Sequence, residues 1–246
     1  VFDLGLRNRT RQLVPLGDVR LKHHWRVSAD DRWAAVAGYS EYPSKAYVFD
    51  LRTGKQKSVL KPDDDLFPND LFGNSISLKG DRVIVGAITA KRGGDSDRPG
   101  AAYIFAVEDG KQIFKLVSKD AKHGDVFGCS VAISDSYAVV GASGTATDGL
   151  EGSGAAYVFD IRTGKQISVL TVRRPVGGEA FGEAVAIFGD MVVIGAPKDR
   201  SLVKGPGAAY LYNVRSGKML AELKPSDGSG RNFFGGAVGI SERLVV

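Results

Sequence analysis

The chain has 246 residues, of which 43% are hydrophobic and 25% are charged, and its formal net charge is +5 at pH 7. This composition is that of a soluble globular protein, and one all-β domain can reach this length. No apolar run approaches the roughly 18–20 residues of a transmembrane helix, so we expect no membrane span. Cys129 is the single cysteine, which excludes an internal disulfide, and no signal-like segment is visible from which targeting could be read.

Strand-like segments begin close to the N-terminus. VFDLG (residues 1–5) and RQLVPL (residues 11–16) are predicted to be strands, and a divergent repeat follows over about residues 17–60. From there a Phe-Gly pair recurs at intervals of 55, 54 and 53 residues, at Phe72, Phe127, Phe181 and Phe234. A regular period in the low fifties is typical of propeller repeats.

Each period holds four strand-like runs separated by Gly, Asp and Pro. In one copy they are Ala155–Ile161, Lys165–Val172, Glu183–Phe188 and Met191–Pro197. Aromatic and β-branched residues fill these runs, which favours strands, and helical periodicity is absent. The turns from first to second strand and from third to fourth are short and carry Gly or Asp, as hairpin turns do.

The remaining connections are long and differ between copies. In an up-and-down sheet they share one face, so we expect a hairpin face that repeats and a variable-loop face that does not. Four antiparallel strands repeated radially predict an all-β fold, a β-propeller of four-stranded antiparallel blades, with residues 1–246 as a single domain.

The number of blades follows from the ends of the chain. FGGAVGI (residues 234–240) and RLVV (residues 243–246) are predicted to be a first and a second strand, and residues 1–16 a third and a fourth. We therefore predict five blades, the last closed by both termini, which would hide the sheet edges. The alternative is a fragment of a six- or seven-bladed ring.

FGEAVAIFGDMVVIGAP and GAAYVFDIRTGK resemble the FG-GAP repeat of integrin α-chain propellers and bacterial exported proteins. The resemblance covers residues 44–246 and implies a propeller that is extracellular or in the cell envelope, as in cell adhesion. Copies of this family often carry an Asp-rich calcium loop between their first two strands. Here that loop is only KGD, SDS, FGD or SER, so we expect no metal and no cofactor.

Several other residue groups could carry chemistry. The acidic run with Asp63, Asp64, Asp65 and Asp70 lacks the alternating spacing of a calcium loop and is interpreted as a solvated loop. Adjacent His23 and His24 point to opposite faces of a strand and cannot share one zinc ion. Cys129 is interpreted as a small core or channel-lining residue, because no His base is evident for a nucleophile.

The basic RTGK turns place Arg52 and Arg162 on the hairpin face, each beside an acidic residue, and local pairing explains them. Nucleic-acid binding would need clustered charge with aromatics in a groove, so we expect no nucleic-acid partner.

The sequence favours a non-catalytic scaffold or binding module that presents variable loops to a protein or glycan, as a monomer or part of a longer chain. One alternative is a hydrolase or lyase with its site at the channel mouth, for which the loops offer Asp70, His123, Asp125, Glu179 and Arg231. The other is a purely structural repeat of a larger surface protein. We predict a ligand-binding face that includes Tyr42, Phe67, Arg92, Asp97, His123, Arg174, Arg200 and Arg231.

Overall fold

The fold is given by a computed structural model that describes residues 25–38, 44–64, 70–90, 98–197, 205–227 and 233–246. These residues form sixteen strands in four antiparallel sheets and no helix. The first sheet contains β1 (Trp25–Ala29), β2 (Trp33–Gly38), β3 (Lys45–Asp50) and β4 (Gln56–Leu60), and the second contains β5 (Phe72–Lys79), β6 (Arg82–Ala87), β7 (Ala101–Ala106) and β8 (Gln112–Leu116). The third contains β9 (Val131–Ile133), β10 (Tyr137–Ala142), β11 (Ala155–Asp160) and β12 (Gln166–Leu170), and the fourth contains β13 (Ala184–Phe188), β14 (Met191–Ala196), β15 (Ala208–Asn213) and β16 (Lys218–Leu223).

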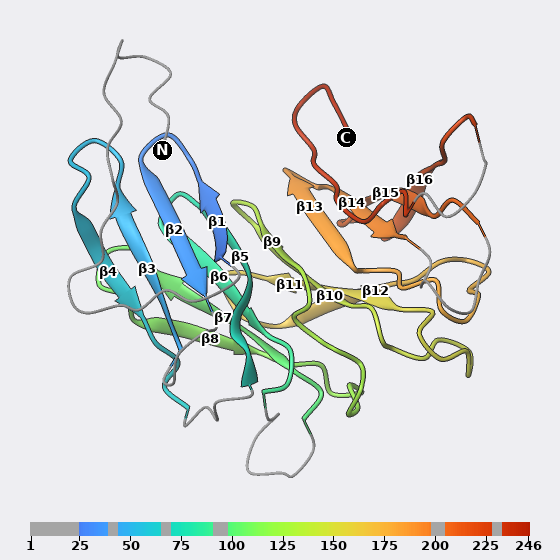
Figure 1. Cartoon of the computed structure of the whole chain (residues 1–246), viewed down its shortest axis with the longest axis horizontal. Coiled ribbons are helices and arrows are strands. Elements are labelled where there is room, and N and C mark those ends of the chain that lie inside the picture. Colours follow the sequence, from blue (N-terminus) through green and yellow to red (C-terminus); the bar gives the residue numbers. More distant parts are fainter. Residues whose placement is uncertain (1–24, 39–43, 65–69, 91–97, 198–204, 228–232) are drawn as a thin grey trace.

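Each sheet is an up-and-down meander in which neighbours in sequence are neighbours in space. The sheets stand side by side as blades, with β1, β5, β9 and β13 toward a common centre (Figure 1). The register repeats from blade to blade, since Tyr103 pairs with Lys115, Tyr157 with Val169, and Tyr210 with Glu222. The predicted all-β fold of four-stranded propeller blades is therefore confirmed.

In the first and third blades, the turns from third to fourth strand share one side-chain hydrogen-bond pattern. The Asp50 Oδ1 atom accepts the backbone N–H groups of Arg52 and Thr53, and Gly54 follows with a φ of 72°. Asp160 and Gly164 repeat this arrangement in the third blade. The backbone N–H donors lower the pKa values of both Asp carboxyls, because they favour the charged form. The Asp of this motif thus sets the turn that the repeated RTG sequence predicts.

The hydrophobic core lies between blades rather than within one. The phenylalanine of a Phe-Gly motif packs in the core between two blades. The centre of the Phe127 ring lies 5.2 Å from that of Tyr157 and 6.1 Å from that of Phe159. All three are almost fully buried, and the same cluster contains Ile84 and Ile104 from the preceding blade. Equivalent aromatic groups centre on Phe72 and Phe181. Each edge-to-face pair contributes about 0.5–1.5 kcal/mol to stability beyond the contribution from burying the apolar surface.

Backbone meets backbone where successive blades join. The Gly182 φ of 91° turns its carbonyl toward β10 of the preceding blade, where a Cβ on Gly141 would lie 1.9 Å from that oxygen. The same approach joins Gly86 to Gly128 and Gly195 to Gly235. No side chain fits at these distances, which explains the glycine in both strands of these three joints. The joint between the first two blades is looser, because a Cβ on Gly73 would lie 3.2 Å from the Cβ atom of Ala37.

A further repeat begins after the fourth blade. Gly235 lies on Gly195 as in the other joints, and residues 239–246 fold back on themselves through two hydrogen bonds between Gly239 and Val246. In Figure 1 this terminal hairpin and the first blade lie on opposite sides of the opening between the blades. Among the described residues no sheet closes the ring. Residues 1–24, to which the closing strands are assigned, lie outside them.

In the described part of the chain we find no helix with the length and apolar character needed to cross a membrane.

The glycine joint gives a first prediction. Gly141→Ala should lower the free energy of unfolding by about 3 kcal/mol, because the new methyl group collides with rigid backbone. Gly177→Ala is the matched control, since its Cβ would meet only Glu151 O at 3.3 Å, and its effect should stay within about 0.5 kcal/mol. Urea denaturation measures both, and equal effects would show that the close approach does not limit this position.

Ring closure is tested separately. The Val246 N–H bonds to Gly239 O within the hairpin, so the alternate amides, those of residues 243 and 245, face the other neighbour. If residues 1–16 pair with the terminal hairpin, these two amide hydrogens are protected from hydrogen exchange in the full chain. Deletion of residues 1–16 should remove that protection, because the second strand then lacks its neighbour. Exchange that is unchanged by the deletion would contradict closure by both termini.

Candidate functional site

Two of the eight residues predicted for ligand binding fall within the described part of the chain. His123 and Arg174 are exposed and lie in the loops that lead into the third and fourth blades. The other six lie outside the described residues, so their roles stay predictions: Tyr42, Phe67, Arg92, Asp97, Arg200 and Arg231.

The loops that link successive blades lie over the next blade. In the second blade Asp64 forms an ion pair with Lys115 on β8 and accepts a hydrogen bond of 3.2 Å from the Tyr103 hydroxyl. The Lys115 ammonium also lies 5.7 Å from the centre of the Tyr103 ring. Burial and the nearby Asp64 charge raise the pKa of Tyr103. A salt bridge beside a phenol thus links the loop between the first two blades to the edge strand of the second.

A groove lies at the equivalent place in the third blade. Asp120 holds the position of Asp64, four residues after the last leucine of the preceding sheet, but Val169 replaces Lys115. Without the long cationic side chain, a cavity of about 720 Å³ remains. We call it the third-blade groove. It is lined by Lys119, Asp120, Ala121, Lys122, Asp125, Thr145, Ala146, Thr147, Asp148, Ala155, Tyr157, Val169 and Thr171.

The fourth blade carries the opposite charges at the same two positions. Arg174 stands in the linking loop where Asp64 and Asp120 stand, and Glu222 on β16 replaces Lys115 and Val169. Glu222 accepts a hydrogen bond of 3.3 Å from the Tyr210 hydroxyl. The charges at these two positions therefore differ in each of the three blades.

The wall of the third-blade groove is held in place by short contacts. Asp125 is only 8% exposed, and its carboxylate accepts the Lys122 N–H at 2.8 Å. The Ser153 hydroxyl accepts the Thr147 N–H at 2.9 Å. Burial raises the pKa of Tyr157, which keeps its phenol neutral. The wall therefore presents fixed backbone, hydroxyl groups and a neutral phenol.

Other lining groups remain for a ligand. No ion pair within the described residues involves Asp120, Lys122 or Asp148. The groove thus offers carboxylates, an ammonium group and hydroxyls in a volume that matches small-molecule sites, which span about 300–1,000 Å³.

Three buried acids have a role that the sequence did not suggest. Asp70, Asp125 and Glu179 each lie two residues before the phenylalanine of a Phe-Gly motif and are at most 8% exposed. Asp70 pairs with Arg98 at 2.8 Å, and Glu179 accepts the Val176 N–H at 3.1 Å. An acidic residue two positions before the phenylalanine of the Phe-Gly motif is therefore a sequence signal for a contact that holds the loop in place. Of these acids, which were considered for an enzyme, Asp125 and Glu179 bond to their own loops and Asp70 pairs with Arg98 in the loop before β7.

The interpretation of the acidic run as a solvated loop is wrong for Asp64 and Asp70. Asp64 pairs with Lys115, and the buried Asp70 pairs with Arg98. Asp63 donates its backbone N–H to the Gln112 side chain, whereas Asp65, His23 and His24 lie outside the described residues. Within the described ranges no group of three His, Cys, Asp or Glu side chains could hold a metal ion.

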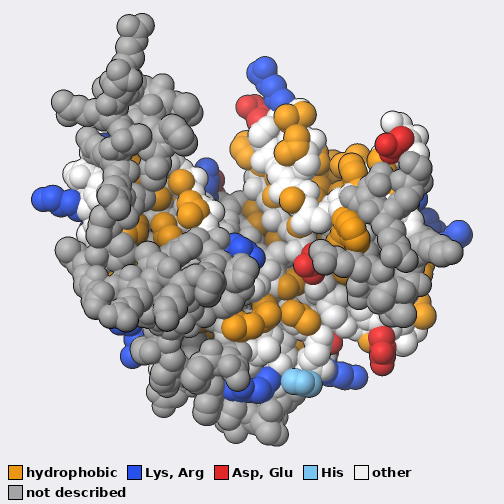
Figure 2. Space-filling model, viewed as in Figure 1, with side chains coloured by type: hydrophobic (Ala, Val, Ile, Leu, Met, Phe, Trp, Pro, Cys, Tyr) orange, Lys and Arg blue, Asp and Glu red, His pale blue; other side chains and the backbone are white. Residues whose placement is uncertain are grey.

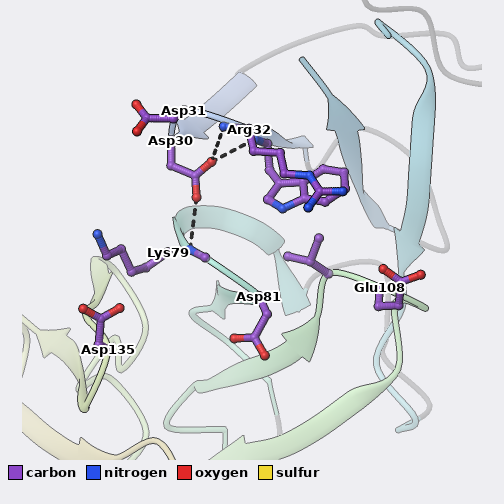
Figure 3. A pocket seen from close by; sticks show the side chains of 10 residues that line it. Asp30, Asp31, Arg32, Lys79, Asp81, Glu108 and Asp135 are labelled. Atoms are coloured by element: carbon purple, nitrogen blue, oxygen red, sulfur yellow. Dashed lines mark hydrogen bonds between the residues drawn. The ribbon is translucent and has the colours of Figure 1, made fainter. Parts of the chain in front are cut away.

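A second cavity, of about 540 Å³, opens on the hairpin face (Figure 3). Its acids join the first two blades: Asp30 accepts the N–H groups of Arg32 and Trp33 and, across the joint, that of Gly80 at 3.0 Å. Glu108 pairs with Lys57 at 2.5 Å. The cavity is lined by Asp30, Asp31, Arg32, Trp33, Lys79, Gly80, Asp81, Val107, Glu108 and Asp135. We assign these contacts to the joint between blades.

Cys129 lies just before the inner strand β9. Its Sγ atom donates to Gly182 O at 3.3 Å, in the joint with the fourth blade. Burial, and then the Glu183 charge, raises the pKa of the thiol to about 11. The thiol is therefore protonated at neutral pH, as expected for a packing residue.

Repeated four-stranded blades joined through glycines define a propeller-type repeat protein. The sequence profile of the FG-GAP repeat matches residues 56–105, 111–159 and 166–212, which is more than half of the chain. The chain belongs to the FG-GAP repeat family. The match is to the repeat itself and does not single out integrin α chains.

Two computationally designed proteins of known structure match the chain. The computationally designed Ika8 protein has a TM-score of 0.55 and 14% identity, over 89% of this chain and 53% of that one. The computationally designed Ika4 protein has a TM-score of 0.47 and 15% identity, over 77% of this chain and 89% of that one. The chain thus spans about half the length of Ika8.

The raised pKa of Cys129 gives a prediction about reactivity. At pH 8 iodoacetamide should modify this thiol about a hundredfold more slowly than a model thiol, because only the thiolate attacks. The rate should keep rising up to a pH near 11. Mass spectrometry over a pH series measures this, and a plateau below pH 9 would mean that the thiol is not shielded.

Proposed function

We propose that the chain is a non-catalytic binding module that holds a polar ligand, a peptide segment or a glycan, in the third-blade groove. One observation carries the proposal. At the same two positions, the second blade forms the Asp64–Lys115 ion pair, whereas in the third blade Val169 faces a cavity that Asp120 also lines. The third blade therefore keeps polar side chains beside a cavity where its neighbour uses them in an internal ion pair.

The chemistry of the groove supports a polar ligand. Asp120 and Asp148 supply acceptors, Lys122 supplies donors, and Tyr157 and Thr171 add groups that both donate and accept. Such a set suits a hydroxyl-rich sugar or a peptide with both charges. Because the wall is fixed by backbone contacts and the blades are joined through glycines, little conformational entropy is lost in the protein on binding.

Membership of the FG-GAP repeat family supports a proposal for where the module acts and with what. FG-GAP repeats are typical of extracellular proteins, which supports a cell-surface or exported module with a role in adhesion or carbohydrate binding. It would act as a monomer or within a longer surface protein.

Binding is tested by closing the groove. The chain is screened on a glycan array and a peptide library, and the best hit is titrated against Val169→Lys. This variant should restore the ion pair seen in the second blade, fill the cavity and weaken binding by about tenfold or more, which is 1.4 kcal/mol. Thermal melting should be unchanged, because Val169 is 43% exposed.

Ile167→Lys is the matched control, since Ile167 lies two residues away on the same strand, is 47% exposed and does not line the groove. It adds the same charge and should leave affinity intact. If both variants bind like the wild type while neutralising Lys55, Lys165 and Lys218 abolishes binding, the ligand docks on the hairpin face.

A further inference from the structure

A third cavity, of about 430 Å³, opens toward the centre of the molecule on the variable-loop face. We call it the inner cavity. It is separated from the third-blade groove by a segment in which the Gly144 N–H bonds to Asp125 O at 3.1 Å. Its lining includes Val126, Ala180 and Phe233, which each precede a Phe-Gly motif, together with Ser143, Glu183 and Pro197.

Glu183 departs from what its position does in other repeats. Asn74 and Cys129 hold the equivalent position, directly after the Phe-Gly pair, and each donates a hydrogen bond to the next blade, to Cys129 O at 3.2 Å and Gly182 O at 3.3 Å. An ionised carboxylate has no proton to donate. Glu183 therefore cannot make the joint-forming contact, and its carboxylate is exposed at the cavity.

Phe233 also differs from the residues at the equivalent position of the other repeats, because it is aromatic. Leu71, Val126 and Ala180 occupy the equivalent position with the same positive φ of 53–57°, so the turn itself does not require an aromatic ring. Phe233 has a φ of 50° and is 37% exposed. Phe233 thus places a partly exposed aromatic ring at the cavity, at the position where the other repeats have an aliphatic side chain.

The charge of the cavity is one-sided. Glu183 is the one ionisable side chain in its described lining, which contains no Lys or Arg. The Glu183 charge also reaches Cys129, whose thiol pKa it helps to raise. A carboxylate and an aromatic ring line this one cavity, and its other lining residues are glycines, apolar residues and Ser143. This is the combination that recognises organic cations through a charge-assisted hydrogen bond and a cation–π contact.

We propose that the inner cavity binds an organic cation, an alkylammonium or guanidinium group, through Glu183 and Phe233. The cation is either a small amine or the basic side chain of a protein partner. This site is distinct from the third-blade groove and goes beyond the function proposed for it.

Three probes test the site by isothermal titration calorimetry on the full chain. One is N-acetyl-arginine amide, and the second is a Gly/Ser peptide with one central Arg. The third is the same peptide with citrulline, which keeps the shape of Arg but carries no charge. Both cationic probes should bind and the citrulline peptide should not. Tighter binding of the Arg peptide identifies a protein partner, and equal binding identifies a small amine.

Variants assign the contacts. Glu183→Gln should weaken the cationic probes by about tenfold or more, through loss of a hydrogen bond to a charged group. Phe233→Leu should weaken them by about threefold, through loss of the cation–π contact alone. Glu242→Gln is the matched control, because Glu242 is an exposed acid of the terminal hairpin, and Val169→Lys should also leave this binding intact.

The proposal is overturned if Glu183→Gln binds the cationic probes as tightly as the wild type, if the citrulline peptide binds equally well, or if no cationic probe binds. Thermal melting of each variant establishes that it is folded. If Glu183→Gln has a lower melting temperature than the wild type, Phe233→Leu, which leaves all charges in place, is used instead. The proposal is then overturned if Phe233→Leu binds the cationic probes as tightly as the wild type.

Discussion

Contact between backbone atoms at the glycine joints is the constraint on which the rest of this structure depends. Gly182 turns its carbonyl against Gly141 of the preceding blade, and only the absence of a Cβ on Gly141 lets the two strands approach. That approach sets the spacing of the sheets, and the spacing lets the phenylalanine of each motif reach the aromatic residues of its own third strand and the aliphatic residues of the blade before. The interblade core is therefore a consequence of the joint, which explains why Phe and Gly recur as a pair.

The periodic part of the fold could be predicted from the sequence, because it is encoded locally. The Phe-Gly interval, the tyrosine-bearing third strand and the Asp-initiated turns each leave a signal within a few residues. The third-blade groove leaves no such signal, since Asp120 and Val169 come from different hairpins and become neighbours only when a linking loop folds over the next blade. In the sequence Val169 is an ordinary strand residue. Its importance follows only from the register, in which Val169 pairs with Tyr157 as Lys115 pairs with Tyr103.

The internal repeats supply the reference that a single sequence otherwise lacks. At a position where Asn74 and Cys129 donate to the following blade, Glu183 cannot, and the comparison separates residues that hold the fold together from residues that do not. The same comparison changes the interpretation of Asp70, Asp125 and Glu179. As isolated acids in loops they suggest chemistry, but as one recurring position before the Phe-Gly motif they form a structural contact of the repeat.

The walls of each groove come from two successive repeats, one from the linking loop after the last strand of the first and the other from the edge strand of the second. A groove is thus a property of a junction and not of a repeat. When a gene of this kind gains, loses or exchanges one of the repeats whose joints are glycine on glycine, the joint re-forms, because it is the same in those three places. Every altered junction nevertheless brings together a loop and a strand that had not met before. An Asp64-type loop placed before a Glu222-type strand, or an Arg174-type loop before a Lys115-type strand, would set like charges face to face and open a new groove without any point mutation. Such a molecule can diversify what it binds by reordering its parts while its core stays unchanged.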